Sequence, residues 1–314
     1  MTLDARAGLI DEGAPPVAAA PSRARRGALG VAADVVALGK PRITAMVIVT
    51  QLGGIALAVH ARGAAPRALT LALAVVGTAL VVAGANTLNM YLERDSDRLM
   101  ERTRDRPLPA GRLAPEVALG VGLLAAVVSV PLLTFAVNAT TGLVAALALV
   151  SYVLAYTPLK RRTTAALLIG AVPGAAPPLI GWTSVTGRVE LPGLLLFAVL
   201  FFWQIPHFLA IATFRRDEYA RAGLKVLPVE RGDAVTRRHV VAHLALLVTA
   251  SLALVPAGVG GRVYLVAATV LGAALFGIGA AGLAPGAGVR WARGLFLSTL
   301  VYLTLLFAAL VVSP

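Results

Sequence analysis

Residues 69–91 read LTLALAVVGTALVVAGANTLNMY, and this uninterrupted apolar stretch sets the class of fold. As a helix that rises about 1.5 Å per residue, it can cross the roughly 30 Å hydrocarbon core of a bilayer. It lacks the alternation of apolar and polar residues that is typical of a transmembrane strand. Similar runs recur along the 314 residues, of which 58% are hydrophobic and 14% charged. We therefore expect an all-α, polytopic membrane protein.

Nine such runs predict nine transmembrane helices. The predicted spans are 43–60, 69–91, 115–136, 139–157, 164–185, 192–213, 239–257, 263–283 and 291–312. Residues 1–38 contain no run of that length and are rich in Ala, Pro, Gly and Arg, so we expect a disordered cytoplasmic arm before a membrane domain over 39–314.

The basic residues predict the orientation of these spans. With the N-terminus inside, 24 of the 28 Lys and Arg residues fall in inner segments. The positive-inside rule then predicts a multi-pass protein of the cell membrane, with a cytoplasmic N-terminus and cytoplasmic charged loops, and with the C-terminus outside. The net charge of +13 could suggest a nucleic-acid partner. We expect none, because the basic residues are divided among loops and interleaved with acids. The absence of cysteine excludes disulfides, thiolate metal sites and cysteine nucleophiles.

A charged stretch, NMYLERDSDRLMERTRDRPLPAGR at 89–112, overlaps the end of the second predicted span. Asn89, Glu93 and Asp97 are spaced by four and share one face of a helix, whereas Asp95 points elsewhere. A polar stripe at the end of a span is costly unless something compensates it. Pairing with neighbouring arginines is the plain explanation. The alternative is a divalent cation, and ligands with oxygen alone favour Mg²⁺.

Three arginines alternate after this stripe, at Arg102, Arg104 and Arg106, before Pro107 stops the helix. Arginine is suited to bidentate recognition of phosphate. Carboxylates beside such a cluster suit a metal-bridged diphosphate. The spacing therefore favours a binding site over a solvated loop.

A second charged segment, WQIPHFLAIATFRRDEYARAGLKVLPVERG, occupies 203–232. Gln204 and His207 are three residues apart and share an intramembrane face. The simplest interpretation of His207 is a side chain that packs between helices. The functional alternative is that it binds a ligand in a cavity or is an axial ligand to an iron porphyrin. The polar candidates of the following loop are Asp217, Glu218 and Lys225.

A third basic segment, YTPLKRRT at 156–163, carries Lys160. The plain interpretation is an anchor on the inner side of the membrane. The functional alternative is extra neutralisation of phosphate charge. Because the two acidic loops each follow an even-numbered span, the sequence also suggests two helical halves that face one cavity.

These stretches resemble the UbiA superfamily of intramembrane prenyltransferases, and most of all its heme-modifying branch. The motif D-x-D-x-x-M-x-R-T-R, which begins at Asp95, and the WQIPHF run are specific to that branch. The resemblance covers residues 40 to the end of the chain. It rests on KPRIT (40–44), NMYLERDSDRLMERTRDRPLPAGR (89–112), YTPLKRRT (156–163), GAVPGAAPPLIGW (170–182), WQIPHF (203–208), DEYARAGLKVLPV (217–229) and ARGLFLSTLVYL (292–303).

The resemblance implies a nine-helix bundle with a central cavity capped on the cytoplasmic side. It implies transfer of a farnesyl group from farnesyl diphosphate to the 2-vinyl group of heme b, with Mg²⁺ as cofactor. The other partners would be membrane lipid and, downstream, heme A synthase or terminal oxidase assembly. The nearest alternative is a relative that acts on a quinone precursor or chlorophyllide, and the distant one is a membrane carrier.

The resemblance also assigns roles to residues. The expected catalytic residues are Asn89, Glu93, Asp97, Arg102 and Arg104. The expected substrate-binding residues are Arg106, Lys160, Gln204, His207, Glu218, Tyr219 and Lys225. The expected metal ligands are Glu93, Asp97, Asp217 and Glu218. The chain departs from the superfamily pattern at Met90, where many members carry Asp, and at Glu93, which stands where Asp is common.

Overall fold

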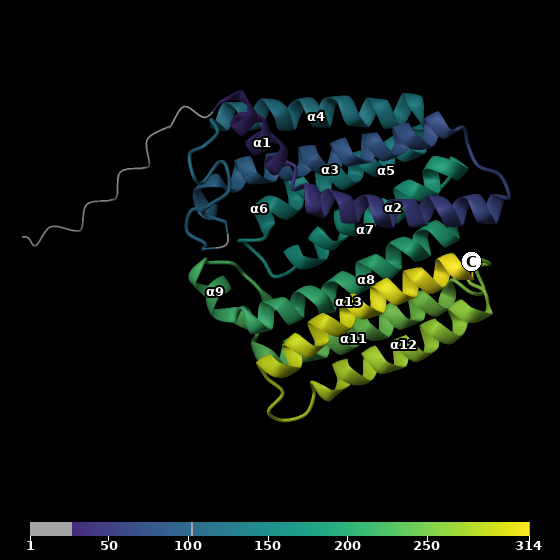
Figure 1. Cartoon of the computed structure of the whole chain (residues 1–314). Coiled ribbons are helices and arrows are strands. Elements are labelled where there is room, and N and C mark those ends of the chain that lie inside the picture. Colours follow the sequence, from purple (N-terminus) through teal and green to yellow (C-terminus); the bar gives the residue numbers. More distant parts are fainter. Residues whose placement is uncertain (1–26, 102, 314) are drawn as a thin grey trace, which may run out of the picture.

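The computed structural model describes residues 27–101 and 103–313, and these ranges fold entirely into helices, turns and loops. The long helices lie side by side in one bundle, with α4 at one edge and α12 at the other (Figure 1). The long helices are α2 (Pro41–Arg62), α3 (Ala68–Asp97), α4 (Pro115–Ala136), α5 (Ala139–Val150), α7 (Ala166–Thr186), α8 (Leu191–Phe214), α11 (Gly232–Ala253), α12 (Arg262–Ala281) and α13 (Val289–Val312). The short elements are α1 (Ala28–Leu38), the π-helical η1 (Ser151–Tyr156), α6 (Thr157–Leu159), α9 (Arg216–Arg221) and α10 (Leu227–Glu230).

Eight of the described helices are long and apolar enough to cross a membrane, with α5, η1 and α6 forming one continuous span. The predicted all-α, multi-pass class is confirmed. The remaining predicted span, 239–257, lies mostly within α11, whose first turns carry Asp233, Arg237 and Arg238. Because of these charges, α11 is not among the eight helices that are apolar enough to cross a membrane. The predicted number of nine transmembrane helices therefore stays a prediction.

The end of the predicted arm differs from expectation. Residues 28–38 form helix α1, so the expected disorder is wrong for this segment. Asp34 of α1 is buried, and Arg112 donates from Nε to its Oδ1 at 3.0 Å. This ion pair ties α1 to the loop after α3. The expectation for residues 1–26 falls outside the described residues.

Helices α2 and α7 touch backbone to backbone at two glycines. A Cβ atom on Gly54 would lie 2.1 Å from the Pro178 carbonyl oxygen, and one on Gly181 would lie 2.2 Å from the Gln51 carbonyl oxygen. Helices in membranes use such small residues to approach closely. This contact fixes α2 against α7, and both helices line the cavity described below.

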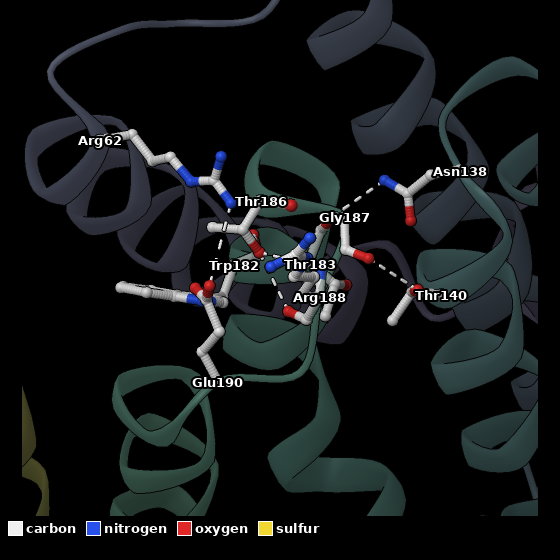
Figure 2. A network of polar contacts seen from close by, with 9 residues as sticks. All are labelled: Arg62, Asn138, Thr140, Trp182, Thr183, Thr186, Gly187, Arg188 and Glu190. Carbon is white, nitrogen blue, oxygen red and sulfur yellow. Dashed lines mark hydrogen bonds and ion pairs between the residues drawn. The ribbon is translucent and has the colours of Figure 1, made fainter.

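A group of side chains satisfies the end of α7 farthest from the charged loops (Figure 2). The last carbonyl groups of a helix lack partners within the helix. Here the end of α2 and the start of α5 supply them, and Gly187 closes the helix in the left-handed conformation with φ +70°. The donors are Arg62 to Thr186 O (3.0 Å), Asn138 to Thr183 O (2.9 Å) and Thr140 to Gly187 O (2.8 Å). We call these residues, with Trp182 and its partner Glu190 (3.0 Å), the distal network.

Candidate active site

A cavity of about 940 Å³ lies among α2, α3, η1, α7, α8 and α13. Its charged lining comes from the end of α3, from the loops after α3, α6 and α8, and from the starts of α2 and α13, all at the end of the bundle opposite the distal network. The predicted site residues that line it are Asn89, Glu93, Asp97, Arg106, Lys160, Gln204, Tyr219 and Lys225. The fold thus gathers residues from three separate sequence motifs around one space.

The stripe on α3 is built as its spacing predicts. Asn89, Glu93 and Asp97 are all buried and all line the cavity, because α3 continues as a helix to Asp97, beyond the predicted end of the span. Asp95 points away: its side chain is 75% exposed and lies 3.8 Å from Arg94. The expectation that Asp95 lies off the stripe is confirmed.

Each buried carboxylate of the stripe has a cationic partner. Lys160 Nζ forms an ion pair with Glu93 Oε1, and Arg106 Nη1 donates to Asp97 Oδ2 at 2.7 Å. Arg106 returns to α3 because the chain turns back after Asp97, where Thr103 Oγ1 donates to the Asp97 carbonyl oxygen at 2.7 Å. Two ion pairs, each with a buried carboxylate and a partly buried cation, therefore lie on the cavity wall.

Lys40 joins these pairs, although the sequence analysis gives it no role. It precedes α2 and has φ 50°, the only positive φ outside glycine among the described residues. Its Nζ lies 3.4 Å from Asn89 Oδ1, so a left-handed backbone turn directs its side chain to the α3 stripe. Burial, with a smaller effect from nearby Arg106, lowers the pKa of Lys40 to about 8. The sequence signal for Lys40 was the family resemblance of the KPRIT motif, which begins with this residue.

A π-helical turn shapes the opposite wall. In η1 the Thr157 backbone N–H and its side-chain Oγ1 both donate to the Tyr152 carbonyl oxygen, five residues earlier. Asn89 Nδ2 donates to the same Thr157 Oγ1 at 3.2 Å, which connects this wall to α3. Tyr152 and Tyr156 line the cavity, and Tyr156 lies one turn before Lys160. Such single π turns are frequent at functional sites.

Several predicted residues are not brought to this wall. Arg104 and Asp217 are exposed and do not line the cavity, and Arg102 falls outside the described residues. Glu218 pairs with Arg215 at 2.7 Å, one turn away on its own segment. The structure does not assemble Asp217 and Glu218 with the α3 carboxylates, and a metal role for them stays a prediction.

Gln204 and His207 lie deeper, on α8. Gln204 lines the cavity, and its Nε2 donates to the carbonyl oxygens of Ala171 (3.2 Å) and Leu200 (3.0 Å), which ties α7 to α8. His207 is buried beside the cavity, with Nδ1 2.8 Å from Thr299 Oγ1. Gln204 thus contacts α7 and His207 contacts α13, and of the two only Gln204 is among the residues that line the cavity. Substrate binding by either residue stays a prediction.

The sequence analysis also missed Arg293 and Phe296, which line the cavity from α13. Both belong to the ARGLFLSTLVYL segment, whose resemblance to other sequences was the only available signal. Nothing in the spacing of an apolar span indicates which of its faces meets a cavity formed by distant helices.

The α3 stripe offers a donor set that fits Mg²⁺. Glu93, Asp97 and Asn89 present oxygen atoms on one buried wall, and the described residues that line the cavity include no cysteine or histidine. Mg²⁺ typically takes one or two protein carboxylates and completes its shell with water and phosphate oxygens. Within the described ranges no third acidic or histidine side chain joins this pair, which agrees with that low number of protein ligands.

The comparison with known families identifies the class of this cavity. The model of the UbiA prenyltransferase family matches residues 47–311, which is most of the chain. The chain belongs to the UbiA prenyltransferase family. A curated relative named protoheme IX farnesyltransferase, from Sorangium cellulosum (strain So ce56), is 61% identical over 85% of this chain and 100% of its own length. Another of that name, from Myxococcus xanthus (strain DK1622), is 50% identical over 89% of this chain and 94% of its own.

Solved structures of other proteins share the fold. A digeranylgeranylglyceryl phosphate synthase superposes with a TM-score of 0.77 over 90% of this chain and 98% of its own, at 17% identity. A UbiA homolog from Archaeoglobus fulgidus, solved with GPP and Mg²⁺, gives 0.62 over 88% of this chain and 99% of its own, at 16% identity. At these identities the likeness concerns the fold alone.

Proposed function

We propose that this chain transfers the farnesyl group of farnesyl diphosphate to the 2-vinyl group of heme b, which gives heme O and diphosphate. The observation that carries the proposal is two ion pairs with buried carboxylates, Glu93–Lys160 and Asp97–Arg106, on the wall of an otherwise largely apolar cavity. Such a site takes a substrate with a charged head and a hydrocarbon tail. The name shared by relatives up to 61% identical supports farnesyl diphosphate and heme as the substrates.

In this reaction the C–O bond of farnesyl diphosphate breaks, and diphosphate leaves with the electron pair. Lys160, Arg106 and Lys40 stand where that negative charge develops, and fixed cations in a water-poor site stabilise it strongly. Glu93 and Asp97, with Asn89 beside them, would hold Mg²⁺, which as a Lewis acid adds to the same stabilisation. The vinyl group forms the new C–C bond, and water captures the resulting cation and releases a proton.

The deeper part of the cavity suits the two hydrophobic substrates. It is lined by Val81, Ala85, Leu149 and Pro177, which exclude water from the allylic cation until the vinyl group attacks. We place the charged wall at the cytoplasmic end, with the N-terminus inside and the C-terminus outside, because 24 of 28 basic residues share that side. Heme A synthase or a terminal oxidase assembly would be the downstream partner.

The distal network favours an enzyme over a carrier. A carrier must open its site to each side of the membrane in turn. Here hydrogen bonds from α2, from the segment that begins α5 and from within the turn after α7 close the far end, and none of the network residues lines the cavity. An alternating-access cycle would have to break these bonds.

A product assay tests the proposed function directly. Purified protein supplied with farnesyl diphosphate and Mg²⁺ is expected to convert heme b, and not a hydroxybenzoate, into a farnesylated product identified by mass spectrometry. Heme extracts of cells that express the chain should contain heme O, whereas extracts of cells without it should not. A prenylated hydroxybenzoate in place of heme O would overturn the choice of acceptor.

The lowered pKa of Lys40 predicts a pH dependence of substrate binding. Below pH 8 Lys40 is protonated and attracts diphosphate, and above it the neutral amine must take up a proton on binding. We expect the affinity for farnesyl diphosphate, measured without heme, to fall by up to about tenfold between pH 8 and pH 9. Lys40→Arg, which stays charged, should remove this dependence. An unchanged pH profile in Lys40→Arg would show that another group is responsible.

A further inference from the structure

The cavity has an apolar end between α2, α3 and α7. On these three helices, the lining residues farthest along the chain from the charged wall of Glu93 and Asp97 are Val47, Val81 and Pro177. All three side chains are apolar. In the proposed reaction, the hydrocarbon tail of the donor therefore points toward this end, while its diphosphate stays at the charged wall.

One helical turn deeper, the three helices close on one another at Gln51. The Gln51 side chain is fully buried, and its Nε2 donates to the Ala74 carbonyl oxygen of α3 at 3.1 Å. Thr78, about one turn below Val81, is also fully buried and donates to the same carbonyl oxygen at 2.8 Å. A Cβ atom on Gly181 would lie 2.2 Å from the Gln51 carbonyl oxygen, so α7 lies directly against α2 here. We call Gln51, Thr78 and Gly181 the cavity floor.

The depth of the cavity above this floor matches the length of a farnesyl chain. From Glu93 to Val81, helix α3 rises about 18 Å, at about 1.5 Å per residue. An extended chain gains about 1.2 Å per bond, so the twelve main-chain bonds of a farnesyl group span roughly 14 Å, and the diphosphate occupies the rest. One further isoprene unit adds four bonds, or about 5 Å, which is close to the roughly 5.4 Å of one helical turn. A donor with four isoprene units would therefore need the turn that Gln51 occupies.

We infer that Gln51 sets the upper limit on the length of the prenyl chain, so that the cavity takes a donor with three isoprene units and rejects one with four. The inference rests on the proposed function and adds to it the determinant of donor length. Gln51 acts through its volume, because its side chain fills the gap between α2 and α3 and its bond to Ala74 holds it there. It lies away from the charged wall, so changes at Gln51 should leave binding of the diphosphate itself unaffected.

Titrations of the full-length, detergent-purified chain with prenyl diphosphates and Mg²⁺ test this inference without any acceptor. Farnesyl and geranylgeranyl diphosphate have the same head group, so the ratio of their dissociation constants reports on the chain alone. Wild-type protein should bind farnesyl diphosphate about 10-fold or more tightly than geranylgeranyl diphosphate. Gln51→Ala, which empties the turn, should bring this ratio close to one. Gln51→Met, which keeps the length of the side chain, should keep the wild-type ratio.

A second variant tests the limit in the opposite direction. Val47→Phe adds volume at the deepest lining position of α2, one turn above Gln51. It should weaken the binding of farnesyl diphosphate by about 10-fold relative to geranyl diphosphate, which is shorter by one isoprene unit. This measurement decides the matter if Gln51→Ala fails to fold, and an unchanged ratio in a folded Val47→Phe protein would contradict the inference.

The matched control is Ile55→Ala. Ile55 lies one turn below Gln51 on the same helix, is buried and does not line the cavity, so this variant removes side-chain volume while the floor stays in place. Its ratio should equal that of wild type. Equal binding of farnesyl and geranylgeranyl diphosphate by wild type would overturn the inference, and so would a wild-type ratio in Gln51→Ala. A chain that shows the length limit but makes no farnesylated heme would instead refute the proposed function.

Discussion

Asp97→Asn is expected to lower the rate of prenyl transfer by about 10²- to 10³-fold, the loss typical when one fixed electrostatic group is removed from a site of developing charge. Asp97 is 1% exposed, lines the cavity and holds Arg106 at 2.7 Å. The amide keeps the shape but removes the negative charge that would bind Mg²⁺ and orient Arg106. The measurement is the rate of heme O formation at saturating substrates, with Mg²⁺ dependence compared between the two proteins.

The neighbouring carboxylate provides the control for this loss. Asp95 is two residues away on the same helix, is 75% exposed and lies only 3.8 Å from Arg94. Exposed ion pairs of this kind contribute at most about 1 kcal/mol, so Asp95→Asn should keep nearly wild-type rate. Equal losses in the two variants would mean that general loop charge, and not the buried stripe, drives the reaction.

Gly54→Ala is expected to produce the largest loss of stability. The added Cβ would lie 2.1 Å from the Pro178 carbonyl oxygen, and a backbone atom cannot move aside as a side chain can. Helices α2 and α7 must separate, at a cost of about 1–3 kcal/mol or more. Alanine gains only about 1 kcal/mol in helix propensity, so the packing effect determines the sign. Thermal unfolding of the purified protein in detergent should show a clearly lowered midpoint.

Gly277 in α12 is the matched control. It is exposed, and nothing lies within 4 Å of a Cβ built there. Gly277→Ala therefore adds helix propensity without a clash and should leave the midpoint unchanged or slightly raised. If both alanine variants behaved alike, the close contact between α2 and α7 would not be a source of stability.

Local patterns were sufficient for eight of the nine predicted spans and for the α3 stripe. The apolar length of 69–91 and the spacing of Asn89, Glu93 and Asp97 act within one helix, where periodicity reports directly on which residues share a face. The same local reasoning placed Asp95 off the stripe. This reasoning placed the end of α3 six residues too early. Charged residues at a membrane surface can belong either to the end of a helix or to the loop that follows, and their pattern does not distinguish the two.

Contacts between distant segments could not be derived in this way. Lys40 meets Asn89 across 49 residues, and Thr299 meets His207 across 92, so no spacing rule connects them. The second acidic pair also depends on the fold, since Glu218, a predicted metal ligand, pairs with Arg215 of its own segment and is not brought to the α3 carboxylates. Only the tertiary fold distinguishes a carboxylate that faces the cavity from one that faces its own loop.

The distal network has an electrical consequence. Carrying one elementary charge through a membrane potential of 100 mV involves about 2.3 kcal/mol. Because Arg62, Asn138 and Thr140 close the end of α7, we expect charged groups to enter and leave the cavity on the side of Glu93 and Asp97. A full turnover of the proposed reaction would then move no net charge through the field. We expect its rate to be independent of the membrane potential.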